Sequence, residues 1–188
     1  MTTEQTIPNK TFTTKEIVLT AMFTAIIAVC AWITIPLGPV SFTLQIFGIF
    51  CAVGILGGRR SLFAVLAYLL LGAVGLPVFD GFSGGISALL SNSGGYLIGF
   101  IFIPLMYIAG EKFFGDKLIV RIISMILGLA ICYAFGTAWF MYAYGRNVEN
   151  VTLAQAMKWC VTPFVPFDLA KLALSIIVSG RIKKYAKL

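Results

Sequence analysis

The stretch VTPFVPFDLAKLALSIIVSG, Val161 to Gly180, is typical of a membrane-spanning helix, except that it contains two charged residues. The hydrocarbon core of a bilayer is about 30 Å thick and needs about 20 apolar residues in a helix. Asp168 and Lys171 interrupt this apolar pattern, and they are three residues apart. An ionisable side chain in a spanning helix costs at least roughly 2.5 to 3.5 kcal/mol on insertion scales, so it normally faces a cavity or a partner. The stretch therefore predicts both a membrane span and a functional position.

The composition of the whole chain indicates a membrane protein. Of its 188 residues, 60% are hydrophobic and only 11% are charged, whereas about 25% of the residues in a soluble domain are charged. The four cysteines occur singly in apolar segments and the chain has no histidine. This pattern predicts neither a zinc site nor a disulfide framework.

Five further apolar segments precede this stretch in the chain. Together the six predict an all-α integral membrane bundle of six helices in a single substrate-binding domain. A polar tail over residues 1–14 precedes them. The six expected spans are Ile17 to Ile35, about Phe42 to Gly57, about Ser61 to Leu76, Gly95 to Gly110, Ile122 to about Tyr144, and about Pro163 to Gly180.

Basic residues gather in alternate intervals between these spans, which predicts the topology. Eleven of the fourteen Lys and Arg residues lie before the first span or after the second, fourth and sixth spans. By the positive-inside rule, both termini should lie in the cytoplasm and the chain should be a multi-pass protein of the cell membrane. Nucleic acid is not an expected partner, since the placement of the positive charge along the chain is better explained by the topology in the lipid membrane.

The connection from Ala73 to Gly95 is predicted to be a lid or a pocket lining on the outer side. It is rich in Gly and Ser but keeps several large apolar residues, and irregular backbone near the membrane needs protein or a water-filled cavity to satisfy it. A mobile surface loop is the alternative. The last outer connection contains a helical pattern that begins after Thr152, a possible N-cap.

The charged pair favours a binding site for a polar small molecule. Asp168 and Lys171 lie on one helix face, and Pro166 before them suits a first turn, where the helix dipole favours a carboxylate. Such a pair can accept from an N–H group and donate to a C=O group of one ligand. A structural ion pair between helices is the alternative, and a proton relay would normally use further ionisable residues in the spans.

Other candidates for the same site lie near the predicted outer side. The amides of Asn92 and Gln45 can each donate and accept hydrogen bonds, and Thr43 is a further candidate ligand residue. Asn92 could equally stabilise a turn, and Thr43 could instead cap a helix. Phe79 and Tyr96 could form apolar walls, although ordinary packing is the commoner role of an aromatic residue in a bundle.

A separate pattern concerns the first span, where Ala21, Ala25 and Ala28 lie on one helix face. Small residues at this spacing allow another helix to approach closely in lipid, within the chain or from a partner. No phosphate-binding loop, dinucleotide-binding turn, metal cluster or catalytic triad occurs in the sequence. The chain is therefore expected not to be an enzyme and to work as a binding subunit with a partner.

Five motifs follow one another along the chain: PVSFTLQ from Pro39, GGRR from Gly57, GLPVFDGFSGGISALL from Gly75, SGGYLIGF from Ser93 and PFDLAKLAL from Pro166. In this order they resemble the BioY family, the biotin-specific substrate-binding (S) components of energy-coupling factor (ECF) transporters. The chain has Ser41 where the family often has a second proline, and Phe167 where it often has glycine. Neither change touches the groups expected to bind the ligand.

The resemblance implies a six-helix bundle that binds biotin near its outer side, without a cofactor of its own, and that assembles with a membrane coupling subunit and two ATPase subunits. It implies that Asp168 and Lys171 bind the ureido ring, that Asn92 and Tyr96 border the pocket, and that Ala21 and Ala25 dock on the coupling subunit. Ser83, Gly84 and Gly85 are hypothetical partners of the biotin carboxylate. An S component for lipoate or thiamin, or a membrane scaffold without a transport role, remains the alternative.

Overall fold

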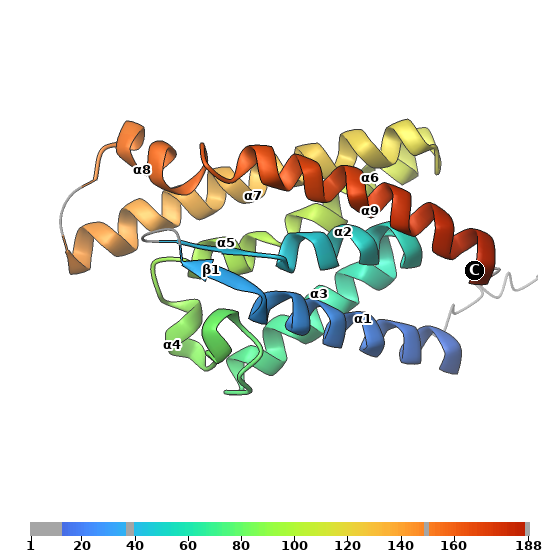
Figure 1. Cartoon of the computed structure of the whole chain (residues 1–188), viewed down its shortest axis with the longest axis horizontal. Coiled ribbons are helices and arrows are strands. Elements are labelled where there is room, and N and C mark those ends of the chain that lie inside the picture. The colour runs from blue at the N-terminus through green and yellow to red at the C-terminus, as the bar shows by residue number, and fades with distance from the viewer. Residues whose placement is uncertain (1–12, 37–39, 149–150, 187–188) are drawn as a thin grey trace, which may run out of the picture.

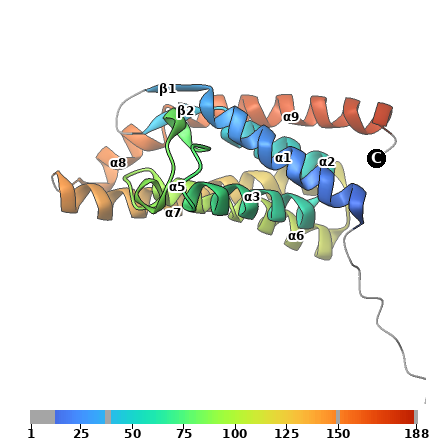
Figure 2. The same cartoon turned by 90° about the horizontal axis from the view of Figure 1, so that it is seen from below.

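Apolar helices packed side by side make up most of the chain in the computed structural model, which describes residues 13–36, 40–148 and 151–186. The bundle is elongated, and its long helices run along its length (Figures 1 and 2). The principal helices are α1 (Thr14–Trp32), α2 (Gln45–Leu56), α3 (Gly58–Ala73), α5 (Gly94–Gly99), α6 (Phe102–Phe114), α7 (Leu118–Asn147), α8 (Leu153–Cys160) and α9 (Val165–Ala186). Two short helices, η1 (Asp80–Phe82) and α4 (Ile86–Leu89), lie between α3 and α5.

Helix α2 lies at the centre of this bundle and packs against α1, α3 and α9. Its sequence QIFGIFCAVGIL is apolar all round, as expected of a helix enclosed by others, and ten of its twelve residues are buried. Gly48 lets it approach α1, because a Cβ atom there would lie 3.3 Å from the Cα of Ile27. Gly54 does the same toward α9, because a Cβ atom there would lie 2.3 Å from Ser179 Oγ. Small residues thus allow the close packing of the central helix.

A two-stranded antiparallel hairpin is an addition to the predicted all-α fold. β1 (Thr34–Pro36) pairs with β2 (Ser41–Thr43), with Ile35 opposite Phe42. The strands are rich in β-branched and aromatic residues, which suit a pleated ladder. Because Phe42 and Thr43 belong to β2, the second helix begins at Gln45, three residues later than the sequence analysis placed it.

The observed helices correspond to the six expected apolar segments, with corrected boundaries. The third helix begins at Gly58 rather than Ser61. It follows directly after Gly57, whose φ of +81° lies outside the helical region and separates α2 from α3. The fourth segment is divided into α5 and α6, and the fifth extends to residues 118–147. The predicted N-cap Thr152 is confirmed, since its side chain accepts a hydrogen bond from the backbone N–H of Gln155.

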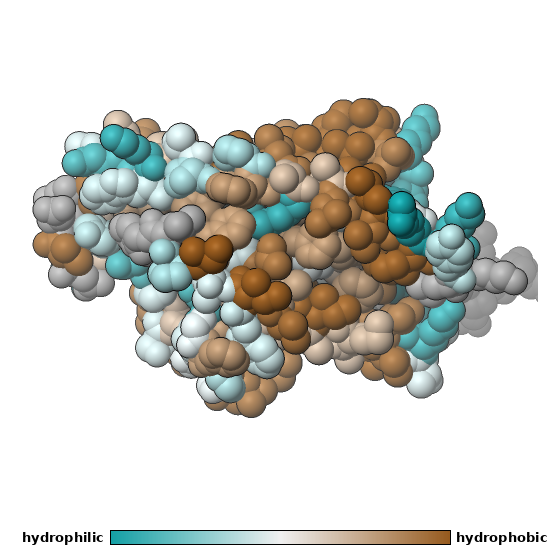
Figure 3. All heavy atoms as spheres, viewed as in Figure 1, coloured by the Kyte–Doolittle hydropathy of each residue, from teal (hydrophilic) through white to brown (hydrophobic). Residues whose placement is uncertain are grey.

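The lengths of these helices support an integral membrane bundle. Three apolar helices in the described part of the chain are long enough to cross a bilayer: Thr14–Trp32, Gly94–Phe114 and Leu118–Arg146. A fourth candidate is the pair Leu153–Cys160 and Val165–Tyr185, which is bent by 44°. Helices α2 and α3 are shorter, so the number of spans stays a prediction. Apolar side chains cover much of the face shown in Figure 3, and hydrophilic ones gather toward its ends.

One end of the bundle carries the start of α1, the α6–α7 turn and the end of α9 (Figure 1). At this end Asp116 accepts hydrogen bonds of 2.6 Å from the Tyr107 hydroxyl and the Arg121 guanidinium. The Tyr107 hydrogen bond and the Arg121 charge lower the pKa of Asp116. Arg121 also donates to the carbonyl of Gly54 at 3.3 Å, which connects the turn to α2. The hairpin, η1, α4 and α8 lie toward the opposite end, where the candidate site is found.

Candidate ligand-binding site

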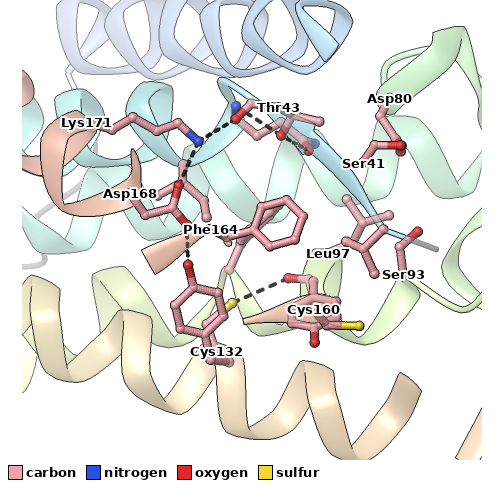
Figure 4. Close-up of a pocket in the computed structure, with 16 residues that line it drawn as sticks. Ser41, Thr43, Asp80, Ser93, Leu97, Cys132, Cys160, Phe164, Asp168 and Lys171 are labelled. Carbon is pink, nitrogen blue, oxygen red and sulfur yellow. Dashed lines mark hydrogen bonds and ion pairs between the residues drawn. The ribbon is translucent and has the colours of Figure 1, made fainter. Parts of the chain in front are cut away.

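A cavity lies between the hairpin, α2, η1, α5, α7 and the α8–α9 bend (Figure 4). Apolar side chains make up much of its wall, and a few polar groups converge on it. Its lining consists of Val40, Ser41, Thr43, Gln45, Ile46, Asp80, Ser93, Tyr96, Leu97, Phe100, Cys132, Tyr133, Cys160, Phe164, Asp168 and Lys171. An apolar cavity with a few placed polar groups is typical of a site for a small molecule.

Asp168 and Lys171, which drew attention to the opening stretch, meet in this cavity. Asp168 lies in the first turn of α9, as predicted, and its exposed fraction is 1%, against 6% for Lys171. The Lys171 Nζ lies 2.7 Å from Asp168 Oδ1, and the Tyr133 hydroxyl of α7 donates to Asp168 Oδ2. The carboxylate thus has a donor on each oxygen, which offsets the cost of burying its charge.

Lys171 also fastens the hairpin to α9. Its Nζ donates to the carbonyl oxygen of Thr43 at 2.7 Å and lies 3.9 Å from the centre of the Phe42 ring, a cation–π distance. An ammonium has three N–H donors and a carboxylate about four acceptor positions, and the contacts above use only part of each set. These contacts therefore leave donor positions of Lys171 and acceptor positions of Asp168 unused within the described part of the chain.

Gln45 and Thr43 line the same cavity, as predicted, and join in a second polar chain. The Thr43 hydroxyl donates to Gln45 Oε1 at 2.9 Å, and Gln45 Nε2 donates to the hydroxyl of Tyr68. Gln45 is buried at the first position of α2. Its amide is held in one orientation, with its oxygen toward the hairpin and its nitrogen toward α3.

Tyr96 forms part of the aromatic wall. Its hydroxyl shares a 3.0 Å hydrogen bond with the Thr137 hydroxyl, and its ring fits against Gly136, where a Cβ atom would lie 2.2 Å from the ring. Phe164 lines the cavity from the α8–α9 bend and stacks on Phe42 at 6.3 Å. The cavity therefore offers apolar ring surfaces beside the charged pair.

The remaining predicted ligand residues do not line this cavity. Phe79 is fully buried and packs edge-on against Tyr68. Ser83 and Gly84 line a neighbouring cavity, together with Asp80, Ser87, Ala88, Ser91 and Ser93. The backbone N–H of Gly85 donates to the Gly72 carbonyl, and Asn92, in the turn between α4 and α5, lies outside the linings of both cavities.

The Ala73–Gly95 connection does line the site, and two tryptophans hold it in place. Trp32 at the end of α1 donates to the Pro77 carbonyl at 2.9 Å and stacks on Phe82 at 5.0 Å. Trp139 of α7 donates to the Ser91 carbonyl at 3.0 Å. The connection contributes Asp80 and Ser93 to the main cavity, so the prediction of a pocket lining is confirmed.

The sequence analysis missed Asp80, Tyr133, Cys132, Cys160 and Phe164 as lining residues. The signal for Asp80 was present, since it is the one charged residue between Ala73 and Gly95. Tyr133 had no local signal, because it lies 35 residues from Asp168 and meets it only where side chains of α7 and α9 reach the same cavity.

The three alanines of α1 do not share one environment. Ala21 and Ala25 are exposed on the outer surface of the bundle, whereas Ala28 is 7% exposed and belongs to the hydrophobic core. Of the expected docking face, the structure thus leaves only Ala21 and Ala25 accessible to another protein.

Comparison with known proteins identifies the family of the chain. The BioY family model matches residues 3–187. The biotin transporter BioY of Thermotoga maritima is 39% identical, with 90% of this chain and 96% of the relative covered. A probable biotin transporter BioY of Pyrococcus horikoshii is 36% identical, with 90% and 96% covered.

A solved structure has the same fold over nearly the whole chain. It is the crystal structure of the S-component for biotin from an ECF-type ABC transporter, with a TM-score of 0.80 and 29% identity, and the match covers 93% of this chain and 95% of that one. On the family match and these relatives, the chain belongs to the BioY family.

Proposed function

We propose that the chain is a biotin-binding S component, which takes up biotin through an ECF-type transporter. The observation that carries the proposal is the buried cluster of Asp168, Lys171 and Tyr133 at the wall of an apolar cavity. The names of the relatives and the description of the solved structure support the choice of biotin. The chain is a transport subunit, not an enzyme, and carries no cofactor.

The chemistry of biotin matches this cavity. The ureido ring has two N–H donors and one carbonyl acceptor, so Asp168 can accept from it and Lys171 can donate to it. The sulfur-containing ring and the aliphatic chain need apolar walls, which Leu97, Phe100 and Phe164 supply. Breaking hydrogen bonds to a charged group leaves buried polar atoms unpaired, so the cavity favours ligands that satisfy both members of the pair.

Calorimetric titration of purified protein with biotin tests the proposal. We expect Asp168→Asn and Lys171→Met each to weaken biotin binding at least about tenfold, roughly 1.4 kcal/mol. Lys184→Met, at the exposed end of α9, is the matched control and should bind like the wild type. If the wild type and all three variants bound biotin with equal affinity, Asp168 and Lys171 would not be ligand-binding residues.

A thermal-shift screen separates the alternatives. Stabilisation by biotin supports the proposal, whereas stabilisation by lipoate or thiamin without an effect of biotin would assign another vitamin. A membrane scaffold should respond to none of the three.

We further propose that uptake requires a membrane coupling subunit and two ATPase subunits, because no ATP-binding motif occurs in the chain. The exposed Ala21 and Ala25 are the proposed docking face on α1. The described basic residues at the end with the α6–α7 turn support six spans with both termini in the cytoplasm.

Single engineered cysteines can test this topology, since all four native cysteines are buried. In intact cells, an impermeant thiol reagent should label Ser87→Cys and leave Lys117→Cys unlabelled. The reverse pattern would invert the topology.

A further inference from the structure

The main cavity is too small to hold biotin unless part of its wall moves. Its volume is about 60 Å³, which is room for roughly four to six water molecules. The fused rings of biotin and its aliphatic chain need more space than that. At least one element that lines the cavity must therefore be displaced when this ligand enters or leaves.

The segment of residues 80–93, which contains η1 and α4, is the part of the wall with the least buried surface. None of its residues is buried, whereas Phe79 before it and Gly94 after it are. The other walls belong to helices of the hydrophobic core and to the hairpin, which Lys171 fastens to α9. Because segments with few buried contacts open at the lowest cost in free energy, we expect the 80–93 segment to move first.

The neighbouring cavity lies along this segment. Its volume is about 320 Å³, and every residue that lines it belongs to the 80–93 segment. Asp80 and Ser93 line both cavities, and Figure 4 shows them on the opposite side of the main cavity from Asp168 and Lys171. A displacement of the segment would therefore join the two cavities and open a route to the charged pair.

Trp32, at the end of α1, holds this segment in place. Its indole N–H donates to the Pro77 carbonyl at 2.9 Å, and its ring stacks on Phe82 at 5.0 Å. Phe82 has a φ of +57°, a backbone conformation that residues other than glycine rarely adopt. Strain of this kind persists only where surrounding contacts maintain it, and Phe82 is itself 63% exposed. Loss of the Trp32 contacts should therefore let the segment relax away from the cavity.

We propose that biotin enters and leaves past the 80–93 segment, and that Trp32 is a positioning residue that keeps this segment over the cavity. The inference rests on the proposed function, because it takes biotin as the ligand of the main cavity. It adds the route of the ligand and a residue that controls the rate of exchange. Trp32 lines neither cavity, and its contacts are broken only while the ligand passes, so it should affect rates more than affinity.

The binding and release rates of radiolabelled biotin on purified protein test the proposal. Trp32→Phe keeps an aromatic ring against Phe82 but cannot donate to Pro77. Both rate constants should then rise at least about threefold, the effect expected of losing one neutral hydrogen bond. Trp32→Ala, which also removes the stack, should raise both further, and the dissociation constant should stay close to that of the wild type. Trp159→Phe, at a tryptophan that packs on Tyr144 outside both linings, is the matched control and should exchange biotin at the wild-type rates.

A double-mutant cycle separates the stack from other effects of these changes. Phe82→Ala removes the other partner of the stack and should also speed release. If both residues act through their contact, Trp32→Ala and Phe82→Ala together should release biotin little faster than the faster single variant. Phe113→Ala, at the exposed end of α6, is the control for Phe82→Ala and should leave release unchanged.

Unchanged rate constants in Trp32→Ala would overturn the proposal, and so would weaker binding that came from slower association alone. A purely structural role of Trp32 predicts fewer binding-competent molecules that release biotin at the wild-type rate, which would also contradict it. If the wild type binds no biotin, the proposed function itself fails. That result is distinct from a wild type that binds biotin at rates the Trp32 variants do not change.

Discussion

At the scale of the residue, the site depends on how a buried carboxylate is held. Asp168 is 1% exposed and receives hydrogen bonds from Lys171 and Tyr133, which come from its own helix and from α7. Lys171 in turn donates to the Thr43 carbonyl, so the hairpin, α7 and α9 meet at this carboxylate. The same contacts that offset the cost of burying the pair in an apolar cavity also fix its orientation toward that cavity.

Tyr133→Phe tests this positioning role. The change keeps the ring but removes the hydroxyl that donates to Asp168 Oδ2. A hydrogen bond to a charged group contributes about 1.5 to 3 kcal/mol, and part of that loss should appear as roughly three- to tenfold weaker biotin binding by calorimetry. Tyr142→Phe is the control, since Tyr142 is exposed and its hydroxyl contacts only Arg146 among the described residues.

A merely structural role of Tyr133 predicts a different result. The melting temperature would then fall while the calorimetric affinity of the folded fraction stayed unchanged. That outcome would contradict the positioning role.

At the scale of the element, the contact between α2 and α9 determines where the charged pair lies relative to Gln45. Helix α9 approaches α2 closely at Gly54, which faces Ser179. Ser179 is buried, and its hydroxyl has no hydrogen-bond partner within the described ranges. The small residues thus serve packing, and the Ser179 hydroxyl adds no hydrogen bond to the contact.

Gly54→Ala should destabilise the bundle, because the new Cβ atom would lie 2.3 Å from Ser179 Oγ and 2.8 Å from Ser179 Cβ. Overpacking of this kind costs about 1 to 3 kcal/mol. Adding Ser179→Gly removes both clashing atoms and should restore most of the apparent melting temperature in detergent, so the two changes should be strongly non-additive. Gly180→Ala, with no atom within 4 Å of the new Cβ, should leave the melting temperature nearly unchanged. Additive losses in the double variant would show that the contact does not limit packing.

At the scale of the whole molecule, the outer surface of α1 is the proposed docking face, and it lies apart from the ligand cavity. Ala21 and Ala25 are exposed, whereas Ala28 contributes to the hydrophobic core. A bulky residue at either exposed position can therefore block a partner helix without reaching the ligand cavity, in whose lining α1 has no residue.

Ala21→Leu and Ala25→Leu should abolish co-purification with the coupling subunit and biotin uptake, and leave calorimetric biotin binding unchanged. Ala138→Leu, at an exposed position of α7, is the matched control and should retain assembly. Uptake at the wild-type rate in the two α1 variants would count against the docking face.

The sequence by itself determined the membrane class, the order of the apolar segments and the position of Asp168 and Lys171 as one buried charged pair. These follow from local properties, namely the length of apolar runs and the cost of an ionisable residue within one. Asp80 carried the same kind of local signal, in a connection without other charges.

The tertiary structure alone decided which distant groups meet. The donation from Tyr133 to Asp168, the hydrogen bond from Lys171 to Thr43 and the separation of Ala28 from Ala21 and Ala25 depend on helix packing. The same holds for Ser83 and Gly84, which line a neighbouring cavity rather than the main one. Sequence spacing specifies the face of one helix, but the contacts between helices depend on how their side chains and glycines fit together, which no single segment specifies.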